Sequence, residues 1–236
     1  MKNIYMTFDM DWACDDVLQY FYEEICRLQI RGTLNVTNDS RVLNEIRKDG
    51  RLELGIHPNF NNLLYNKSEN ENIDAIIKGL KEIVPEAVTE RSHSLVTGSQ
   101  VNKCLYENGI LYESNFFYEL SDNIKMNYYE DYMGLKHIPF FFEDDFYLMN
   151  KNRKNISDYF QGDLLVFNFH PIHLFLNTEN VKRYENAKKY YHKYSQLKTC
   201  RNMLGWGIRS CFEELVMMAH ERGYSFKMLR EIGDEE

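Results

Sequence analysis

Residues 4–12 of this chain read IYMTFDMDW, and this stretch decides which fold the sequence predicts. Its first half is almost wholly apolar and aromatic, as expected of a strand that is buried on both faces. It then ends in two carboxylates, Asp9 and Asp11, with one residue between them. Residues two apart in a strand point to the same side, so these carboxylates would repel each other. A bound cation would remove that repulsion, which makes this strand end a candidate metal site.

Strand-like and helix-like segments alternate along the rest of the chain. Helical spacing of apolar residues, such as Val17, Phe21 and Ile25, predicts helices over residues 15–30, 40–50, 73–84, 99–109, 178–197 and 207–223. Buried strands are expected at residues 4–10, 32–38, 53–59, 87–96 and 224–229, and in the first half of 163–176, where a loop should follow. Residues 110–120, 134–142 and 144–149 look strand-like, and 61–72 looks like a loop.

Repeated strand–helix units predict a parallel sheet covered by helices. We expect an α/β fold, a single-domain distorted (β/α) barrel of about seven parallel strands. Residues 1–236 should form one domain, because no linker rich in Pro, Ser or Gly interrupts them. A doubly wound open sheet is the alternative.

Polar clusters follow four of the predicted strands, at residues 9–11, 57–59, 91–93 and 168–173. Parallel strands bring these ends to one edge, where the active sites of such barrels lie. Carboxylate and imidazole are common ligands of zinc and related ions. A single Asp or His at a strand end is usually structural, and we interpret His137, His192 and His220 in that way. The coincidence at four strand ends indicates a metal site.

Composition excludes several other classes of function. Acidic residues outnumber basic residues 36 to 28, and the formal net charge of −8 argues against binding to a nucleic-acid backbone. No apolar run is long enough to span a membrane, and no secretory signal pattern is visible, so a cytoplasmic protein is expected. The five cysteines form no CxxC pair, which indicates reduced thiols rather than a zinc–cysteine site.

These residues resemble the polysaccharide deacetylases of the NodB-homology type, carbohydrate esterase family 4. The family's first motif, TFDD, is similar to TFDMD at residues 7–11, with one residue inserted between the carboxylates. Its second motif matches LGIHPNF at 54–60, and its third begins with an arginine, here Arg91. The late strand ending in a catalytic His is matched by VFNFHPIH at 166–173, and the last helix-to-strand passage by residues 221–232.

Two departures from the family pattern indicate a divergent branch, similar to the WbmS-type sugar-polymer enzymes. The second metal-binding His of the family is replaced by Asn61, and the Pro-Tyr pair that follows the arginine is missing. Asn is a poor zinc ligand, so His93 is the better candidate for the third position. The expected ligands are therefore Asp11, His57 and His93.

The resemblance implies hydrolysis of an N-acetyl group, or less readily an O-acetyl group, on a saccharide or cytoplasmic glycan precursor. A divalent ion would polarise the carbonyl and activate water; zinc is the first choice, with cobalt, nickel or manganese as alternatives. Asp9 would be the general base, held ionised by Arg91. His170 would be the general acid, with His173 as a supporting or alternative acid. One of residues 143–145 is a candidate hydrogen-bond partner for His170.

Two other functions compete with this prediction. The first is hydrolysis of another amide, such as a formyl group. The second is a catalytically silent barrel that binds sugar. The Asn at position 61 favours the silent barrel. The combination of Asp9, Arg91 and His170 argues against it, because binding alone needs no base and acid pair.

Overall fold

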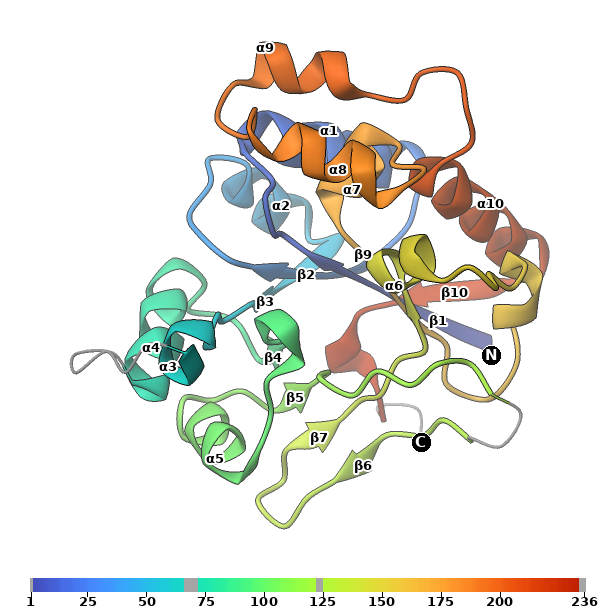
Figure 1. Cartoon of the computed structure of the whole chain (residues 1–236). Helices are drawn as coiled ribbons and strands as arrows, with labels where there is room; N and C mark the ends of the chain where they lie inside the picture. Colours follow the sequence, from blue (N-terminus) through green and yellow to red (C-terminus); the bar gives the residue numbers. More distant parts are fainter. Residues whose placement is uncertain (1, 66–71, 122–124, 234–236) are drawn as a thin grey trace.

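The first strand, β1 (Lys2–Asp9), lies at the centre of the sheet (Figure 1). The computed structural model of the chain describes residues 2–65, 72–121 and 125–233. From Ile4 onward every residue of β1 is buried. The strand pairs in parallel with β2 (Gly32–Val36), β9 (Val166–Phe169) and β10 (Tyr224–Lys227). With neighbours on both edges and helices on its outer face, β1 needs the unbroken apolar run that the sequence has.

The other strands extend the sheet on both sides of β1. Within the described residues the order is β6-β7-β5-β4-β3-β2-β1-β9-β8, with β10 attached to β1. All the pairs are parallel except β6–β7. The remaining strands are β3 (Leu52–Ile56), β4 (Thr89–Glu90), β5 (Tyr112–Glu113), β6 (Tyr129–Glu130), β7 (Lys136–His137) and β8 (Phe142–Glu143). The sheet curls into an incomplete barrel, which confirms the predicted fold class.

Helices cover the outside of this curled sheet (Figure 1). They are α1 (Asp15–Arg27), α2 (Leu43–Asp49), α3 (Asn61–Tyr65), α4 (Ile73–Ile83), α5 (Ser99–Glu107), α6 (Asp144–Met149), α7 (Pro171–Leu176), α8 (Val181–Lys188), α9 (Tyr194–Leu197) and α10 (Ile208–Glu221). Short 3₁₀ turns occur at His93–Leu95, Ile156–Tyr159, Lys198–Cys200 and Leu229–Glu231. None of the helices in the described ranges has the length and apolarity needed to cross a bilayer.

The long amphipathic helices lie where their periodicity predicts them. The buried face of α1 includes Phe21, whose ring packs edge-on against Phe8 of β1 with centroids 4.7 Å apart. Phe212 of α10 packs against the same Phe8 ring at 6.0 Å. One central aromatic residue therefore joins the first and last long helices to β1.

The short elements differ from the sequence prediction. Residues 144–149 form α6 instead of a strand, with Asp144 and Asp145 in the first turn, where a helix favours negative charge. Residues 171–176 form α7 instead of a loop, because Pro171 presets the first turn. Both helices have six residues, and all six residues of α7 are buried. Their sequences therefore show no amphipathic period from which a helix could be predicted.

Three further segments were predicted as single elements and are divided in the structure. The predicted helix 178–197 forms α8 and α9, and residues 189–193 between them are not helical. In the segment 87–96 only Thr89–Glu90 is strand, because Ser94 and Leu95 adopt positive φ angles of 60° and 55° in the following turn. Within the predicted loop 61–72, residues Asn61–Tyr65 form α3, and residues 66–71 lie outside the described part of the chain.

Candidate active site

The carboxyl ends of β1, β3, β4 and β9 meet around one cavity of about 270 Å³. Asp9 is the last residue of β1, and His57, Arg91 and His170 directly follow the other three strands. The registers Ile56↔Glu90 and Phe8↔Phe169 place these strand ends side by side. The polar clusters therefore converge at one edge, as parallel strands require. A larger cavity of about 480 Å³ lies near Lys2, at the opposite end of β1.

Three side chains predicted as metal ligands come together on one side of this cavity. Asp11 Oδ2 lies 3.1 Å from His57 Nε2 and 2.7 Å from His93 Nδ1. One oxygen and two ring nitrogens thus lie within 4.8 Å of one another. His57 is buried, whereas 30% of the His93 side chain is exposed, so the group is open on one side.

This donor set fits a divalent transition metal. Burial alone would raise the pKa of Asp11, but its contacts with His57 and His93 bring the pKa far below its ordinary value, so the carboxylate is ionised. The other ring nitrogen of His57, Nδ1, has no hydrogen-bond partner among the described residues and faces Asp9 Oδ1 at 3.7 Å. A carboxylate behind a ligating imidazole is typical of metal-binding histidines. Three protein ligands with an open side are typical of catalytic zinc sites.

Asn61 takes no part in this group. Its side-chain amide lies 3.3 Å from Ser94 Oγ, to which it donates a hydrogen bond, and it does not line the cavity. In the family that the sequence resembles, this position carries the second histidine. Here its side chain points toward the turn formed by residues 93–95. That same turn carries His93 into the site.

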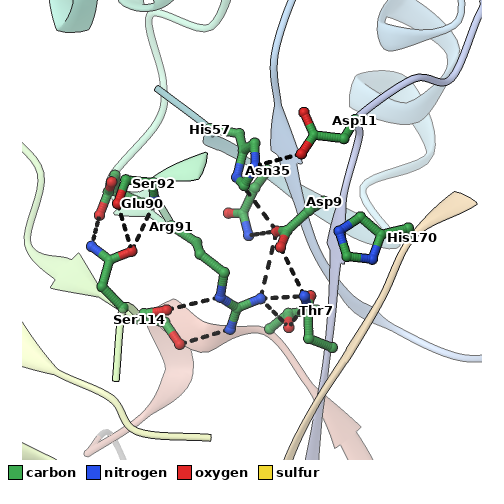
Figure 2. A network of polar contacts seen from close by, with 12 residues as sticks. Thr7, Asp9, Asp11, Asn35, His57, Glu90, Arg91, Ser92, Ser114 and His170 are labelled. Carbon is green, nitrogen blue, oxygen red and sulfur yellow. Dashed lines mark hydrogen bonds and ion pairs between the residues drawn. The ribbon is translucent and has the colours of Figure 1, made fainter. Parts of the chain in front are cut away.

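Asp9 is buried and held from both sides by amides (Figure 2). Asn35 donates to its Oδ1 and Asn168 donates to its Oδ2, each at 2.8 Å. Burial alone would raise the pKa of Asp9, but the charges of Arg91, His57 and His170 bring it below the ordinary value. Asp9 is thus an oriented carboxylate that lies outside the Asp11–His57–His93 group and faces the His57 ring from behind.

Arg91 is fully buried beneath Asp9 (Figure 2). Its Nη1 lies 3.5 Å from Asp9 Oδ1, an ion pair rather than a short hydrogen bond. It donates instead to Asn168 Oδ1 and Thr7 Oγ1, both at 2.6 Å, and to the backbone and hydroxyl oxygens of Ser114. Arg91 therefore supports Asp9 by its charge and by fixing the Asn168 amide.

His170 stands on the other side of Asp9 and has its own carboxylate partner. Its Nδ1 lies 2.6 Å from Asp144 Oδ1, and its backbone N–H donates to Asp144 Oδ2 at 2.8 Å. Burial would lower the pKa of His170, but the negative charge of Asp144 raises it well above its ordinary value. The expectation that one of residues 143–145 binds His170 is met by Asp144. His173 forms a separate pair, with its Nε2 2.8 Å from Asp145 Oδ1.

The rim of the cavity is aromatic. Trp12, which follows Asp11, has a positive φ of 59° and is 49% exposed. Its ring stacks on Tyr191 with centroids 4.5 Å apart. Tyr184 also lines the cavity, and Lys188 Nζ lies 4.5 Å from the centre of its ring. The exposed ring of Trp12 suits stacking on the apolar face of a sugar ring.

Sequence reasoning missed the two amides that orient Asp9. Asn35 lies inside the predicted strand 32–38, and the structure buries it fully. The only signal in the sequence is a polar amide between apolar residues of a strand, which must find a hydrogen-bond partner when it is buried. Asn168 belongs to one of the polar clusters, but nothing in the sequence links it to Asp9. Both contacts depend on the pairing of β1 with β2 and β9.

Comparison with known proteins finds similarity over most of the chain. The family model described as WbmS-like polysaccharide deacetylase matches residues 6–188. The crystal structure of a protein described as a polysaccharide deacetylase involved in O-antigen biosynthesis, WbmS from Bordetella bronchiseptica, is 30% identical. The similarity covers 91% of this chain and 90% of that one, with a TM-score of 0.83. No curated protein sequence matches this chain.

More distant structures share only the fold. A carbohydrate esterase of family 4 from Streptococcus mutans is 13% identical, with a TM-score of 0.52 over 96% of this chain and 85% of that one. The family 4 esterase from Streptomyces lividans is 10% identical, with a TM-score of 0.51 over 96% and 92%. The family match, the WbmS similarity and the curled parallel sheet lead to one conclusion: the chain belongs to the WbmS-like polysaccharide deacetylase family.

Proposed function

We propose that this protein is a metal-dependent deacetylase that hydrolyses an N-acetyl group on a saccharide. One observation carries the proposal: an ionised carboxylate, Asp9, and a carboxylate-supported imidazole, His170, flank a converging Asp–His–His group in a single cavity. Amide hydrolysis needs a polarised carbonyl, an activated water and a protonated leaving amine. The cavity contains a candidate for each requirement.

Asp11, His57 and His93 would hold the metal ion. When bound, a divalent ion supplies Lewis-acid polarisation of the acetyl carbonyl and lowers the pKa of water. Two imidazoles and one carboxylate favour zinc, and cobalt, nickel or manganese would fit the same donors.

Asp9 would accept the proton of the attacking water. Its pKa, which Arg91, His57 and His170 lower despite burial, keeps it ionised near neutral pH. The amides of Asn35 and Asn168 each occupy one of its oxygens and fix the plane of the carboxylate. Asp9 can therefore act as a base without rotating into the ligand group.

His170 would donate the proton to the leaving amine. The negative charge of Asp144 raises its pKa despite burial, so the ring carries a proton over a wide pH range. Such a positioned acid contributes about 10²–10⁴-fold to the rate. The negative Asp9 would thus take up the proton of the attacking water, and the positive His170 would supply the proton that the leaving amine needs.

The substrate would be an acetylated saccharide or glycan precursor. The aromatic rim formed by Trp12 and Tyr184 supports a sugar-sized ligand. The WbmS relative, described as involved in O-antigen biosynthesis, supports a unit of a surface glycan as the substrate.

Acetate release from a panel of acetylated saccharides tests the proposal. The chelator-treated protein should be inactive and should recover with zinc, cobalt, nickel or manganese. Formylated analogues in the same panel test the rival amide substrate. Metal analysis that finds no bound ion, together with no acetate release under any condition, would favour the silent sugar-binding barrel.

The variant Asp9→Asn tests the assigned base. Turnover should fall about 10²–10⁴-fold, because the proton acceptor is lost. Metal should still bind at a saturating concentration, because Asp9 is not among the proposed ligands and only faces the His57 ring from behind. Asp163→Asn, which changes an exposed carboxylate far from the cavity, is the matched control. Normal turnover in Asp9→Asn would refute the base assignment.

A further inference from the structure

Glu143 is a carboxyl group in the catalytic cavity that the proposed chemistry does not use. It is the last residue of β8 and pairs in register with Asn168 of β9. This register places it next to the strand that carries His170. Its side chain lines the same cavity as Asp9 and Asp11.

The other acids of the cavity each have a partner. Asp9 accepts from two amides, Asp11 contacts two imidazoles, and Asp145 contacts His173. Glu143 makes no hydrogen bond and no ion pair with any other residue of the described ranges. A largely buried carboxyl without a partner costs folding free energy, so its place at the cavity wall needs a functional explanation.

The state of the Glu143 carboxyl suits contact with a hydroxyl group. Burial raises its pKa to about 7, and the charges of Asp144, Asp9 and Asp145 act in the same direction, whereas His170 opposes them. Near neutral pH the group is therefore present both as a donor and as an acceptor of hydrogen bonds. A sugar hydroxyl can pair with either form.

The position of Glu143 indicates which part of the substrate it can reach. One of its oxygens lies within 4.8 Å of a ring nitrogen of His170, the proposed donor to the leaving amine. A substrate that places its amide nitrogen at His170 would bring one of the two neighbouring ring positions within reach of Glu143. On an acetamido sugar at least one of these positions carries a hydroxyl group when it is unsubstituted.

We propose that Glu143 is a specificity residue that hydrogen-bonds the ring hydroxyl vicinal to the acetamido group of the bound sugar. The protein then selects saccharides in which that hydroxyl is free. This inference rests on the proposed deacetylase function for the orientation of the sugar. It adds a substrate contact that the metal group, the base and the acid do not provide.

The test uses the metal-loaded protein, an acetamido sugar that it accepts, and analogues that lack each vicinal hydroxyl. Wild type should discriminate against one analogue by about 10- to 100-fold in kcat/KM, because a polar group of the site is left unpaired. Glu143→Ala should lose a similar factor on the parent sugar and should no longer distinguish the two. Glu143→Gln retains a donor and an acceptor and should keep most of the discrimination. Glu130→Ala, on the exposed strand β6, is the control.

A binding measurement separates this inference from the proposed function. Calorimetry with the deacetylated sugar and its deoxy analogue needs no turnover and should give the same pattern of discrimination. If no saccharide is hydrolysed but binding still depends on Glu143, the proposed reaction fails and the sugar contact stands. If Glu143→Ala discriminates against the deoxy analogue as wild type does, or if wild type binds no sugar, the inference is wrong.

Discussion

At the residue scale, the two carboxylates at the end of β1 meet different neighbours, which is why we propose different roles for Asp9 and Asp11. Asp9 is surrounded by amide donors, whereas Asp11 meets two imidazoles. The residue between them lets the chain leave the strand, and Trp12 then turns it with a positive φ. Two acids separated by one residue thus point to one cavity without sharing a proton.

The proposed third metal ligand, His93, can be tested at the same scale. We expect His93→Ala to lower zinc content and affinity by about 10-fold or more, because one of three donors is removed. Asn61→Ala should retain wild-type metal content, since that amide bonds Ser94 instead. Metal analysis after dialysis against a weak chelator measures both. A full complement of metal in His93→Ala with loss in Asn61→Ala would reverse the assignment.

The pair His170–Asp144 predicts a shift in the pH profile of catalysis. Removing the negative charge in Asp144→Asn should lower the pKa of His170, because burial then acts against the protonated ring with less opposition. The alkaline limb of kcat/KM should move about 1–3 units toward lower pH.

Asp145→Asn is the control for this shift. It changes the neighbouring acid, whose direct partner is His173, so the limb should move much less. Equal shifts in both variants would argue against a dedicated role for Asp144.

At the element scale, close packing between strands holds the site together. Gly55 of β3 lies between β2 and β4, and a methyl group there would approach Thr89 Oγ1 to 2.5 Å and Asn35 Oδ1 to 2.7 Å. Asn35 is the amide that orients Asp9. The absence of a side chain at this position therefore permits the close packing of the strands and leaves Asn35 in contact with Asp9.

Gly55→Ala should destabilise the fold by about 1–3 kcal/mol, because the added methyl group overpacks the sheet. Gly79→Ala is the matched substitution in α4, where nothing lies within 4 Å, and it should stabilise by about 0.5–1 kcal/mol through helix propensity. Denaturant unfolding of both variants measures the difference. If Gly55→Ala is as stable as wild type, the close approach in β3 is relieved by small shifts of the strands.

At the scale of the whole molecule, a second buried network fixes the far side of the sheet. His137 Nδ1 of β7 lies 2.5 Å from Glu113 Oε2 of β5, and its Nε2 lies 3.3 Å from Asp131 Oδ2. Burial would lower the pKa of His137, but these two carboxylates raise it above its ordinary value. The network lies beyond β4, away from the metal-ligand group, so its charge affects global stability.

This network predicts how stability depends on pH. Because its pKa is raised in the folded state, His137 contributes to the free energy of unfolding. This contribution is fully present below about pH 6.5 and is lost as the pH rises through the folded-state pKa. The stability difference between wild type and His137→Gln should therefore be largest near pH 6 and should shrink toward pH 9, by about 1.4 kcal/mol per unit of pKa shift. His192→Gln, at an exposed histidine, measures the effect of losing any histidine. A difference that grows with pH would contradict the assignment.

Local pattern alone determined much of this protein. The apolar run of β1 and the periodic helices could be predicted because burial imposes a period on neighbouring residues. Polar groups directly after strands predicted the meeting of Asp11, His57 and His93, because parallel strands end at the same edge. Six-residue helices such as α6 and α7 escaped prediction, since they are too short to show a period.

Only the tertiary structure decided which polar groups touch. Asn168 reaches Asp9 from 159 residues away, and Asp144 rather than its neighbours binds His170. Glu143 is left facing the cavity by the same arrangement. These choices depend on strand register and on how the sheet curls. Strand register and sheet curl are set by packing interactions across the whole molecule, and no short stretch of sequence determines them.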